Sequence, residues 1–398
     1  MKPRFSRREL AGSLGDLGTL LPLALGLILL NGLDATTIFI TIGLFYILSG
    51  LYFRVTVPVQ PMKVIAAYAI VGAVSPVQIS TAGMCMSILL LVLAITGTMT
   101  LVRRLVPLPT IRGVQLVTGV LLFMQGLKFI LGQTTLQQAQ GSAEPFLSVS
   151  SIGPIPIGLL LGVVATILIF LLLENRYTPA ALVVVVGGAI TGLLLGGWYN
   201  LADFSLGLHL PSPLPFGWPG MEDLVIALTA LALPQLPMTI GNAVIAQSDL
   251  THKYFDEEEA RRSTPRALAI SMGLANLVTS LLGGMPLCHG AGGLAAHYRF
   301  GARTYGSNLM IGGAFLVVGL IVGDKAVAIF GLLPFSVLGA LLCFAGAQLA
   351  MVILDVKQRK DLFVVVAILS ISLITNLSVG FGIGIVLAYL LKHSKMNV

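Results

Sequence analysis

A glycine-rich stretch inside apolar sequence, Met285–Thr304 (MPLCHGAGGLAAHYRFGART), carries the residue types best suited to binding chemistry. Its glycines at Gly290, Gly292 and Gly293 leave backbone amides uncovered by side chains, which suits close approach of a ligand to the start of a helix. The stretch therefore predicts a helix that begins within the apolar sequence and presents free N–H groups to a ligand.

A second stretch, Pro58–Lys63 (PVQPMK), has a similar character. It combines the polar Gln60 with Pro61, a residue favoured in the first turn of a helix, and then Lys63. Two broken, polar, helix-starting segments at corresponding places of two halves are the best sequence pointer to the binding site of a transporter.

The composition is that of a membrane protein. Hydrophobic residues make up 56% of the 398 residues, charged residues 10%, and the mean hydropathy is +0.97, whereas soluble domains carry about 25% charged residues. The net charge of +7 lies between apolar runs and forms no basic stripe interleaved with aromatics, so nucleic acid is not an expected partner. We therefore expect an all-α polytopic membrane protein in the lipid bilayer.

Apolar windows of about 20 residues mark the membrane-spanning segments. Two further segments, 57–75 and 285–300, are predicted to be spans with a broken first half. Together they predict fourteen transmembrane segments, of which the twelve full ones cover residues 12–31, 35–53, 80–102, 107–131, 153–173, 178–197, 221–247, 267–283, 306–322, 326–352, 362–376 and 379–392.

Fourteen segments divide into two repeats of seven, with a broken segment third in each. The repeats cover 1–197 and 221–398, and 198–220 is the extracytoplasmic loop between them. An odd number of segments per repeat makes the second repeat inverted relative to the first. With cytoplasmic termini, twenty of the 23 lysines and arginines fall on the cytoplasmic side, which is the distribution that the positive-inside rule predicts.

The broken segments are expected to meet in the middle of the bilayer. Residues 55–60 favour an extended form that covers about 20 Å, which brings Gln60 to mid-bilayer. The second chain segment enters from the opposite side, and its helix begins near Gly290. Each helix start carries about half a positive charge, so with Lys63 the pocket holds about two positive charges and suits a small dianion.

The candidate site residues come from the two broken segments and from the first and eighth spans. Asp16 is the proton-coupling candidate, because it is an acid beside an anion site. The expected substrate-binding residues are Thr19, Gln60, Met62, Lys63, Gln235, Asn242, Cys288, His289, Gly290, Ala291 and Gly292.

Structural roles are open alternatives for several of these residues. Lys63 could pair with Asp16 or extend toward the interface, and Asp16 could cap a helix. Gln60, Gln235 and Asn242 could instead cross-link helices.

Metal or thiol chemistry is not expected. Cys85, Cys288 and Cys343 lack paired spacing, and the neighbouring Cys288 and His289 point in different directions. The chain has no Ser/His/Asp arrangement and no HExxH motif, so we expect neither an enzyme nor a cofactor.

The motifs PVQPMK and CHGAGGLAAHYRFGART, with GDLGTLLP near the start and PQLPMTIGNAVIA in the second half, resemble the molybdate transporter family, a branch of the sulfate permease superfamily. The resemblance covers essentially the whole chain. It implies the fourteen-span inverted-repeat fold shared with uracil permease, with a core of spans 1–4 and 8–11, a gate of spans 5–7 and 12–14, and substrate between spans 3 and 10.

Two departures from the family pattern are evident. Tyr305 stands where a small residue is expected, and the chain ends at Val398, so we expect no regulatory domain of the kind that follows many sulfate permeases.

The expected function is secondary active transport of a tetrahedral oxyanion, foremost molybdate, by alternating access, with proton symport as a hypothesis. Sulfate, bicarbonate and nucleobases are the alternative substrates, although Lys63 argues against a neutral nucleobase. A homodimer through the gate and a location in the inner or plasma membrane are also expected.

Overall fold

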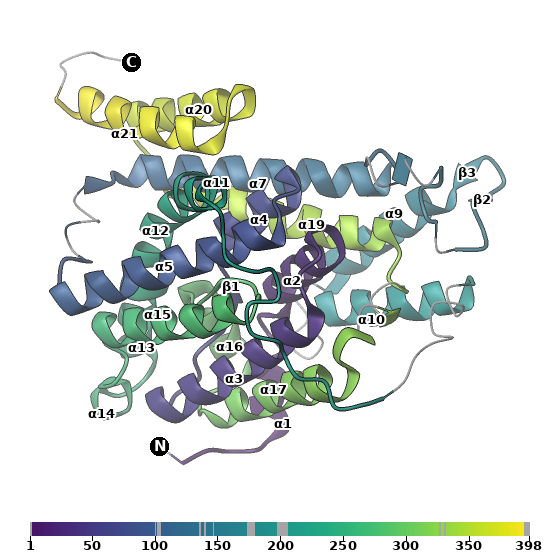
Figure 1. The fold of residues 1–398 in the computed structure, drawn as a ribbon, viewed down its shortest axis with the longest axis horizontal. Helices are drawn as coiled ribbons and strands as arrows, with labels where there is room; N and C mark the ends of the chain where they lie inside the picture. The colour runs from purple at the N-terminus through teal and green to yellow at the C-terminus, as the bar shows by residue number, and fades with distance from the viewer. Residues whose placement is uncertain are drawn as a thin grey trace.

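The computed structural model describes residues 2–99, 101, 105–134, 137–138, 141–145, 147–172, 180–196, 206–325, 328–329 and 332–393. The chain is almost entirely helical (Figure 1). In its first half the elements are α1 Arg7–Ser13, α2 Leu17–Asn31, α3 Ala35–Phe53, β1 Gln60–Pro61, α4 Lys63–Gly72, α5 Pro76–Thr96, α7 Leu108–Ile130, β2 Ser151–Ile152, β3 Ile155–Pro156, α9 Ile157–Leu172 and α10 Ala180–Leu194.

The second half opens with one long helix, Met221–Tyr254, that contains two π-helical segments. Its elements are α11 Met221–Ile226, η2 Ala227–Ala232, α12 Leu233–Met238, η3 Thr239–Ala246, α13 Gln247–Tyr254, α14 Glu257–Ala260, α15 Pro265–Leu281, β4 Leu287–Cys288, α16 Ala291–Phe300, α17 Gly306–Val317, η4 Val318–Val322, η5 Gly323–Lys325, α19 Phe335–Ala350, η6 Met351–Asp355, α20 Arg359–Ile374 and α21 Leu377–His393.

Several helices are long and apolar enough to cross a bilayer. Five qualify on length and composition, and α1 with α2, bent by 48° relative to each other, form a sixth candidate. Shorter apolar helices follow the same sequence windows, including α4, α9, α10 and α21. Four of the basic residues predicted to be cytoplasmic, Arg103, Arg104, Arg176 and Lys395, lie outside the described residues. Residues 198–205 of the predicted loop between the repeats also lie outside them.

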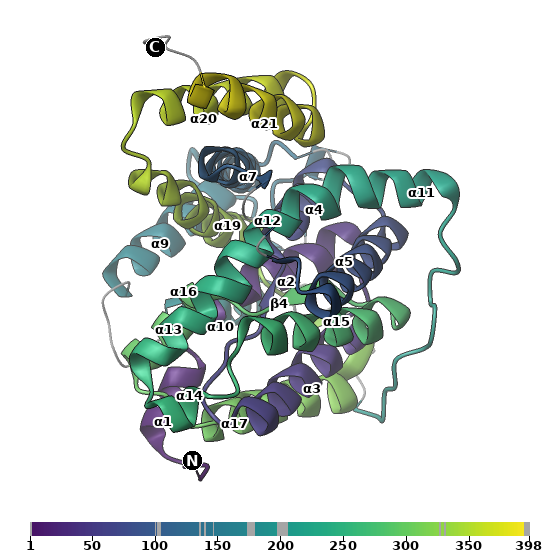
Figure 2. The ribbon, with the colours of Figure 1, turned by 90° about the vertical axis from the view of Figure 1, so that its left-hand side faces the viewer.

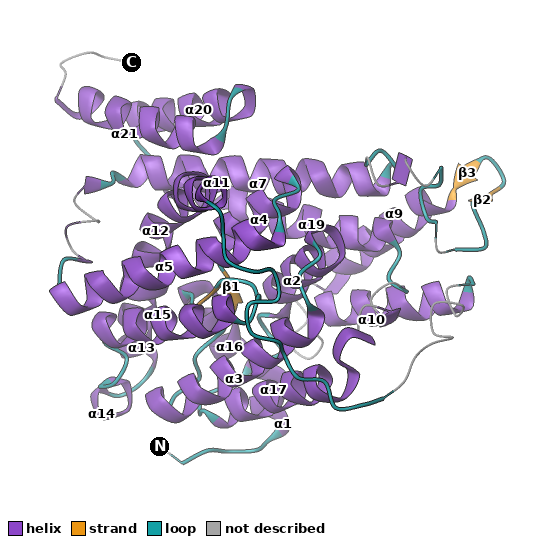
Figure 3. Cartoon of the chain, in the orientation of Figure 1, coloured by secondary structure: helices purple, strands orange, loops and turns teal. Residues whose placement is uncertain are grey.

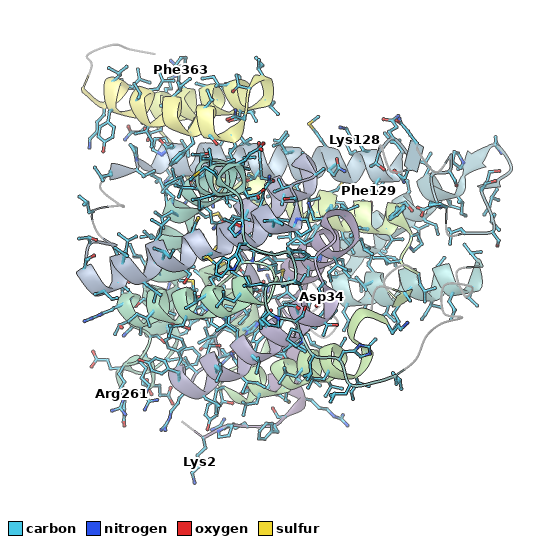
Figure 4. The ribbon with its side chains drawn as sticks, viewed as in Figure 1. Lys2, Asp34, Lys128, Phe129, Arg261 and Phe363 are labelled. Atoms are coloured by element: carbon cyan, nitrogen blue, oxygen red, sulfur yellow. The ribbon has the colours of Figure 1, made fainter. Side chains whose placement is uncertain are left out.

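The helices at the two ends of the chain's arrangement are easily told apart. In Figure 2, α7, α19, α20 and α21 lie in the upper part, and α3, α15 and α17 lie in the lower part. α14 lies at one end of the bundle and the β2–β3 hairpin at the other, with Arg261 on the α14 side (Figures 1 and 4).

Glycines allow the closest helix contacts. A Cβ atom on Gly119 of α7 would lie 2.6 Å from the carbonyl oxygen of Gly346 on α19, and one on Gly346 would lie equally close to the oxygen of Gly119. Gly43 of α3 and Gly312 of α17 face each other in the same way. Small residues let helix backbones approach within a membrane, where packing rather than the hydrophobic effect holds helices together.

Candidate functional site

The two stretches singled out by their sequence are joined as a short antiparallel strand pair at the centre of the molecule. In β1 and β4, Gln60 lies opposite Cys288 and Pro61 opposite Leu287, as Figure 3 shows. α4 begins at Lys63 directly after β1, and α16 begins shortly after β4. The two helix starts therefore lie on either side of one strand pair.

Buried asparagines hold the extended backbone on both sides of this pair. Asn308 of α17 accepts from the N–H of Val57 at 3.0 Å and donates to its carbonyl oxygen at 2.7 Å. Asn276 of α15 does the same for Leu287, at 2.9 Å and 2.7 Å. Backbone that is neither helical nor exposed to water needs such partners, so these residues make the strand pair possible.

A cavity of about 600 Å³ adjoins the strand pair, and α2, α4 and α16 contribute to its lining together with α7, α9 and α19. The open face of α16 reaches it at Gly292, where an added Cβ would meet nothing within 4 Å. The polar and charged side chains that line the cavity are Asp16, Thr19, Gln60, Lys63, Arg112, Gln115, Asn242, Arg299 and Gln348.

Asp16 and Gln60 are joined by a short hydrogen bond. Gln60 Nε2 donates to Asp16 Oδ2 at 2.6 Å, and both side chains are buried. Asp16 stands at the N-cap position of α2, but its side chain makes no capping bond. Gly293 lets this pair lie against α16, because a Cβ there would be 2.6 Å from Asp16 Oδ2.

Lys63 faces the cavity as a cation without an ion-pair partner. Among the described residues the ion pair is that of Arg112 with Asp355, and Lys63 is not joined to Asp16 by one. Its ammonium group is thus available to an anion in the same cavity as the start of α16.

The two helix starts are not equivalent. Gln235 Oε1 accepts from the N–H of Val64 at 2.8 Å and of Ile65 at 3.3 Å, so a side chain already occupies the start of α4. At the start of α16, no described group accepts from the first three amides, those of Ala291, Gly292 and Gly293. The site that an anion could occupy is therefore at α16.

Several predicted site residues lie beside the cavity instead of lining it. His289 is fully buried, with Nδ1 2.9 Å from the carbonyl oxygen of Pro58 and Nε2 3.2 Å from Ser271 Oγ. Cys288 Sγ lies 3.5 Å from the carbonyl oxygen of Pro61, and Met62 is fully buried. Residues predicted for substrate binding that are absent from the lining are Met62, Gln235, Cys288, His289, Gly290 and Ala291.

Other lining residues escaped the sequence analysis. Arg112 and Gln115 come from α7, and Gln348 comes from α19. A helical register places Arg112 and Gln115 on one face, but their sequence gives no sign that this face meets the strand pair. Arg299, interpreted from sequence position as an interfacial anchor, also lines the cavity.

A family model described as "Molybdate transporter of MFS superfamily" matches residues 8–122 and 227–349, which include β1, β4 and the starts of α4 and α16. The chain belongs to the molybdate transporter family. It is 34% identical to Molybdate transporter 2 of Arabidopsis thaliana over 98% of this chain and 88% of that protein. It is also 34% identical to Molybdate transporter 1 of the same plant, over 94% and 86%. The resemblance based on the four motifs is thus confirmed.

Solved structures of anion transporters share the fold of this molybdate transporter family member. The SLC26A9 structure superposes with a TM-score of 0.66 at 15% identity, over 97% of this chain and 65% of that chain. The transmembrane domain of the cyanobacterial bicarbonate transporter BicA gives 0.63 at 18% identity, over 97% of both chains. The chain is therefore an integral membrane protein and a transporter, not an enzyme.

Proposed function

We propose that this chain is a secondary active transporter of a tetrahedral oxyanion, with molybdate as its substrate. The observation that carries the proposal is the shared cavity of the open α16 start and the unpaired Lys63. A helix start contributes about half a positive charge and free N–H groups, and lysine adds one full charge. Together they favour a compact dianion over a neutral ligand.

The carrier works by alternating access between a core and a gate. The core is formed by the predicted spans 1–4 and 8–11, and the gate by spans 5–7 and 12–14. The cavity supports this division, since its lining residues come both from the proposed core helices α2, α4 and α16 and from the proposed gate helices α7 and α19. Gate movement relative to the core would expose the anion first to one face of the membrane and then to the other.

The cavity is proposed to open to the cytoplasm. Three of its polar lining residues lie near helix ends: Arg112 in the first part of α7, Gln348 in the last part of α19 and Arg299 in the last part of α16. In the predicted topology these are all cytoplasmic ends. The basic residues on that side, where Arg261 lies beside α14 (Figure 4), support the orientation.

An inverted repeat of seven plus seven segments is supported by the pairing of its members. α7 packs on α19, the fifth and twelfth spans, and β1 pairs with β4, in the third and tenth. α3 packs on α17, and α15 packs on α5. Each of these pairs joins the second span of one repeat to the fourth span of the other, as a two-fold relation between the repeats requires.

We further propose a homodimer through the gate in the inner or plasma membrane. The detergent-corrected mass of the purified protein tests it.

Proton symport is proposed to drive uptake, with Asp16 as the titrating group. An ionised Asp16 cancels about half of the positive charge that an anion would meet, and protonation restores it. This residue lies in the same cavity as Lys63 and is bonded to Gln60 next to the start of α16.

The decisive experiment is uptake by the full chain purified into liposomes, with and without an inward proton gradient. Labelled molybdate should accumulate and be displaced by unlabelled molybdate and tungstate. Competition by sulfate and by bicarbonate tests whether the size or the charge of an anion is enough for transport. Competition by uracil tests the nucleobase alternative. Displacement by uracil but not by molybdate would overturn the proposal.

A further inference from the structure

We propose that Gln60 is the positioning residue that couples protonation of Asp16 to anion binding, through a reversal of its side-chain amide. The inference rests on the proposed anion site and proton coupling. It assigns a role to a group that neither of them needs: the carbonyl end of the Gln60 amide.

That carbonyl end is a buried acceptor without a donor. Gln60 is 1% exposed, and its Oε1 has no hydrogen-bond partner among the described residues. The atom is directed at the start of α16, because a Cβ on Gly290 would lie 2.4 Å from it and 3.4 Å from Asn242 Nδ2. An unsatisfied buried acceptor costs free energy, so its persistence calls for an explanation.

The opposite end of the amide explains why the oxygen points this way. An ionised carboxylate can only accept hydrogen bonds, so Asp16 Oδ2 binds the Nε2 end of Gln60. The oxygen is then left facing the place where an oxyanion would bind to α16. With Asp16 ionised, Gln60 Oε1 faces the oxygen atoms of the anion. Both are hydrogen-bond acceptors, so this arrangement opposes anion binding.

Protonation reverses each of these preferences. The proton enters on Asp16 Oδ2, and the new O–H donates to Gln60 Oε1 once the amide has turned by half a rotation. Nε2 then takes the place of Oε1 at the Gly290 end of α16 and donates to the oxyanion at the start of that helix. No bond other than O–H is formed or broken, and the proton leaves Asp16 when the anion has left.

The neighbouring titratable groups are occupied elsewhere or are cationic. Lys63, Arg112 and Arg299 line the same cavity and are cationic, and Arg112 is paired with Asp355. Tyr46 donates to the carbonyl oxygen of Val59. The remaining titratable groups nearby, which lie outside the cavity lining and contact other groups, are Cys288, His289 and His297.

The reversal of the Gln60 amide predicts a measurable linkage between proton binding and anion binding. If protonation favours binding of the anion, the anion must favour binding of the proton by the same factor. Titration calorimetry of the detergent-purified full chain with molybdate, in buffers of different ionisation enthalpy, gives both the dissociation constant and the protons taken up. The wild type should bind more tightly as the pH falls and should take up protons with the anion.

Two variants separate the amide reversal from simple charge repulsion. Gln60→Met keeps the volume but has no amide, so it should bind about tenfold more weakly at acidic pH and lose most of the pH dependence of the wild type, because only the charge of Asp16 then acts. Asp16→Asn should bind without proton uptake at any pH. If charge repulsion alone acts, Gln60→Met keeps the pH dependence of the wild type, and our inference is wrong.

The remaining outcomes separate this inference from the proposed function. A wild type that binds no molybdate at any pH refutes the anion site itself. A wild type that binds molybdate without pH dependence refutes the coupling by Gln60 but not the anion site. If Gln60→Met does not fold, the proton count of Gln60→Ala decides: this variant also lacks an amide and adds no titratable group, and a pH dependence equal to that of the wild type would overturn the inference.

Discussion

His289 Nδ1 lies 2.9 Å from the carbonyl oxygen of Pro58, which joins the segment after β4 to the segment before β1. The other ring nitrogen contacts Ser271 of α15, so a single buried imidazole ties three parts of the chain together. A neutral imidazole has one donor and one acceptor nitrogen. Donation to Pro58 and acceptance from Ser271 would satisfy both.

His289→Phe tests whether this role is structural. The variant keeps the aromatic volume but removes both hydrogen bonds, and it leaves the buried Pro58 carbonyl without a partner, at a cost of about 1–3 kcal/mol. We expect a lower melting temperature of the purified protein, with little change in molybdate affinity of the folded fraction. Unchanged stability with lost affinity would instead assign His289 to the anion site.

Lys63→Gln should weaken molybdate binding by at least tenfold, because hydrogen bonds to a charged group contribute about 1.5–3 kcal/mol. Lys128→Gln is the matched control, since Lys128 is exposed on α7 and absent from the cavity lining. It removes the same charge and should bind as the wild type does. Equal affinities of the two variants would show that Lys63 does not contact the anion.

Substitution of two nearby glycines should have opposite effects on stability. At Gly292 an added methyl group meets nothing within 4 Å, so Gly292→Ala should raise helix stability by up to about 1 kcal/mol. The methyl group also covers the amides that face the cavity, so molybdate affinity should fall. Thermal melting and calorimetry of the same sample measure both effects.

Gly290→Ala should instead destabilise the protein. Its methyl group would displace Gln60 Oε1 and strain the bond between Gln60 and Asp16, and overpacking of this kind costs about 1–3 kcal/mol. Gly313→Ala in α17, where an added Cβ also meets nothing within 4 Å, is the control. A variant at Gly290 as stable as that control would contradict the tight packing described here.

Asp16→Asn should abolish the response of uptake to a proton gradient, because the side chain can no longer take up a proton. Molybdate exchange without a gradient should continue. Asp256→Asn is the control, since this exposed aspartate before α14 makes no side-chain capping bond. Uptake by Asp16→Asn that still follows the gradient as in the wild type would exclude Asp16 as the coupling group.

The helix starts at Lys63 and Ala291 could be predicted because their signals are local, whereas the pairing of β1 with β4 was not predicted. Pro61 and the glycines after His289 break helices wherever they occur, and apolar sequence on both sides leaves few places for the break. The helical membrane architecture followed from composition alone. The fourteen-span count and the roles of individual site residues stay predictions.

The direction of individual side chains could not be predicted. Gln235 was expected in the pocket, but its side-chain oxygen accepts hydrogen bonds from the first turn of α4. This contact depends on how the long helix Met221–Tyr254 packs against α4. The support of Asn276 and Asn308 also escaped prediction, although an asparagine in an apolar helix is a signal worth testing. The contacts of Gln235 and Asn308 join residues at least 170 positions apart, beyond any sequence period.

The mutual bonding of β1 and β4 constrains any movement of the protein. Each strand is only two residues long and has the other as its partner, so neither can shift without leaving buried backbone groups unpaired. We therefore expect the two helix starts to move as one rigid unit during the proposed transport cycle. An anion bound there would keep the same ligands on both sides of the membrane, and only the surrounding helices would differ.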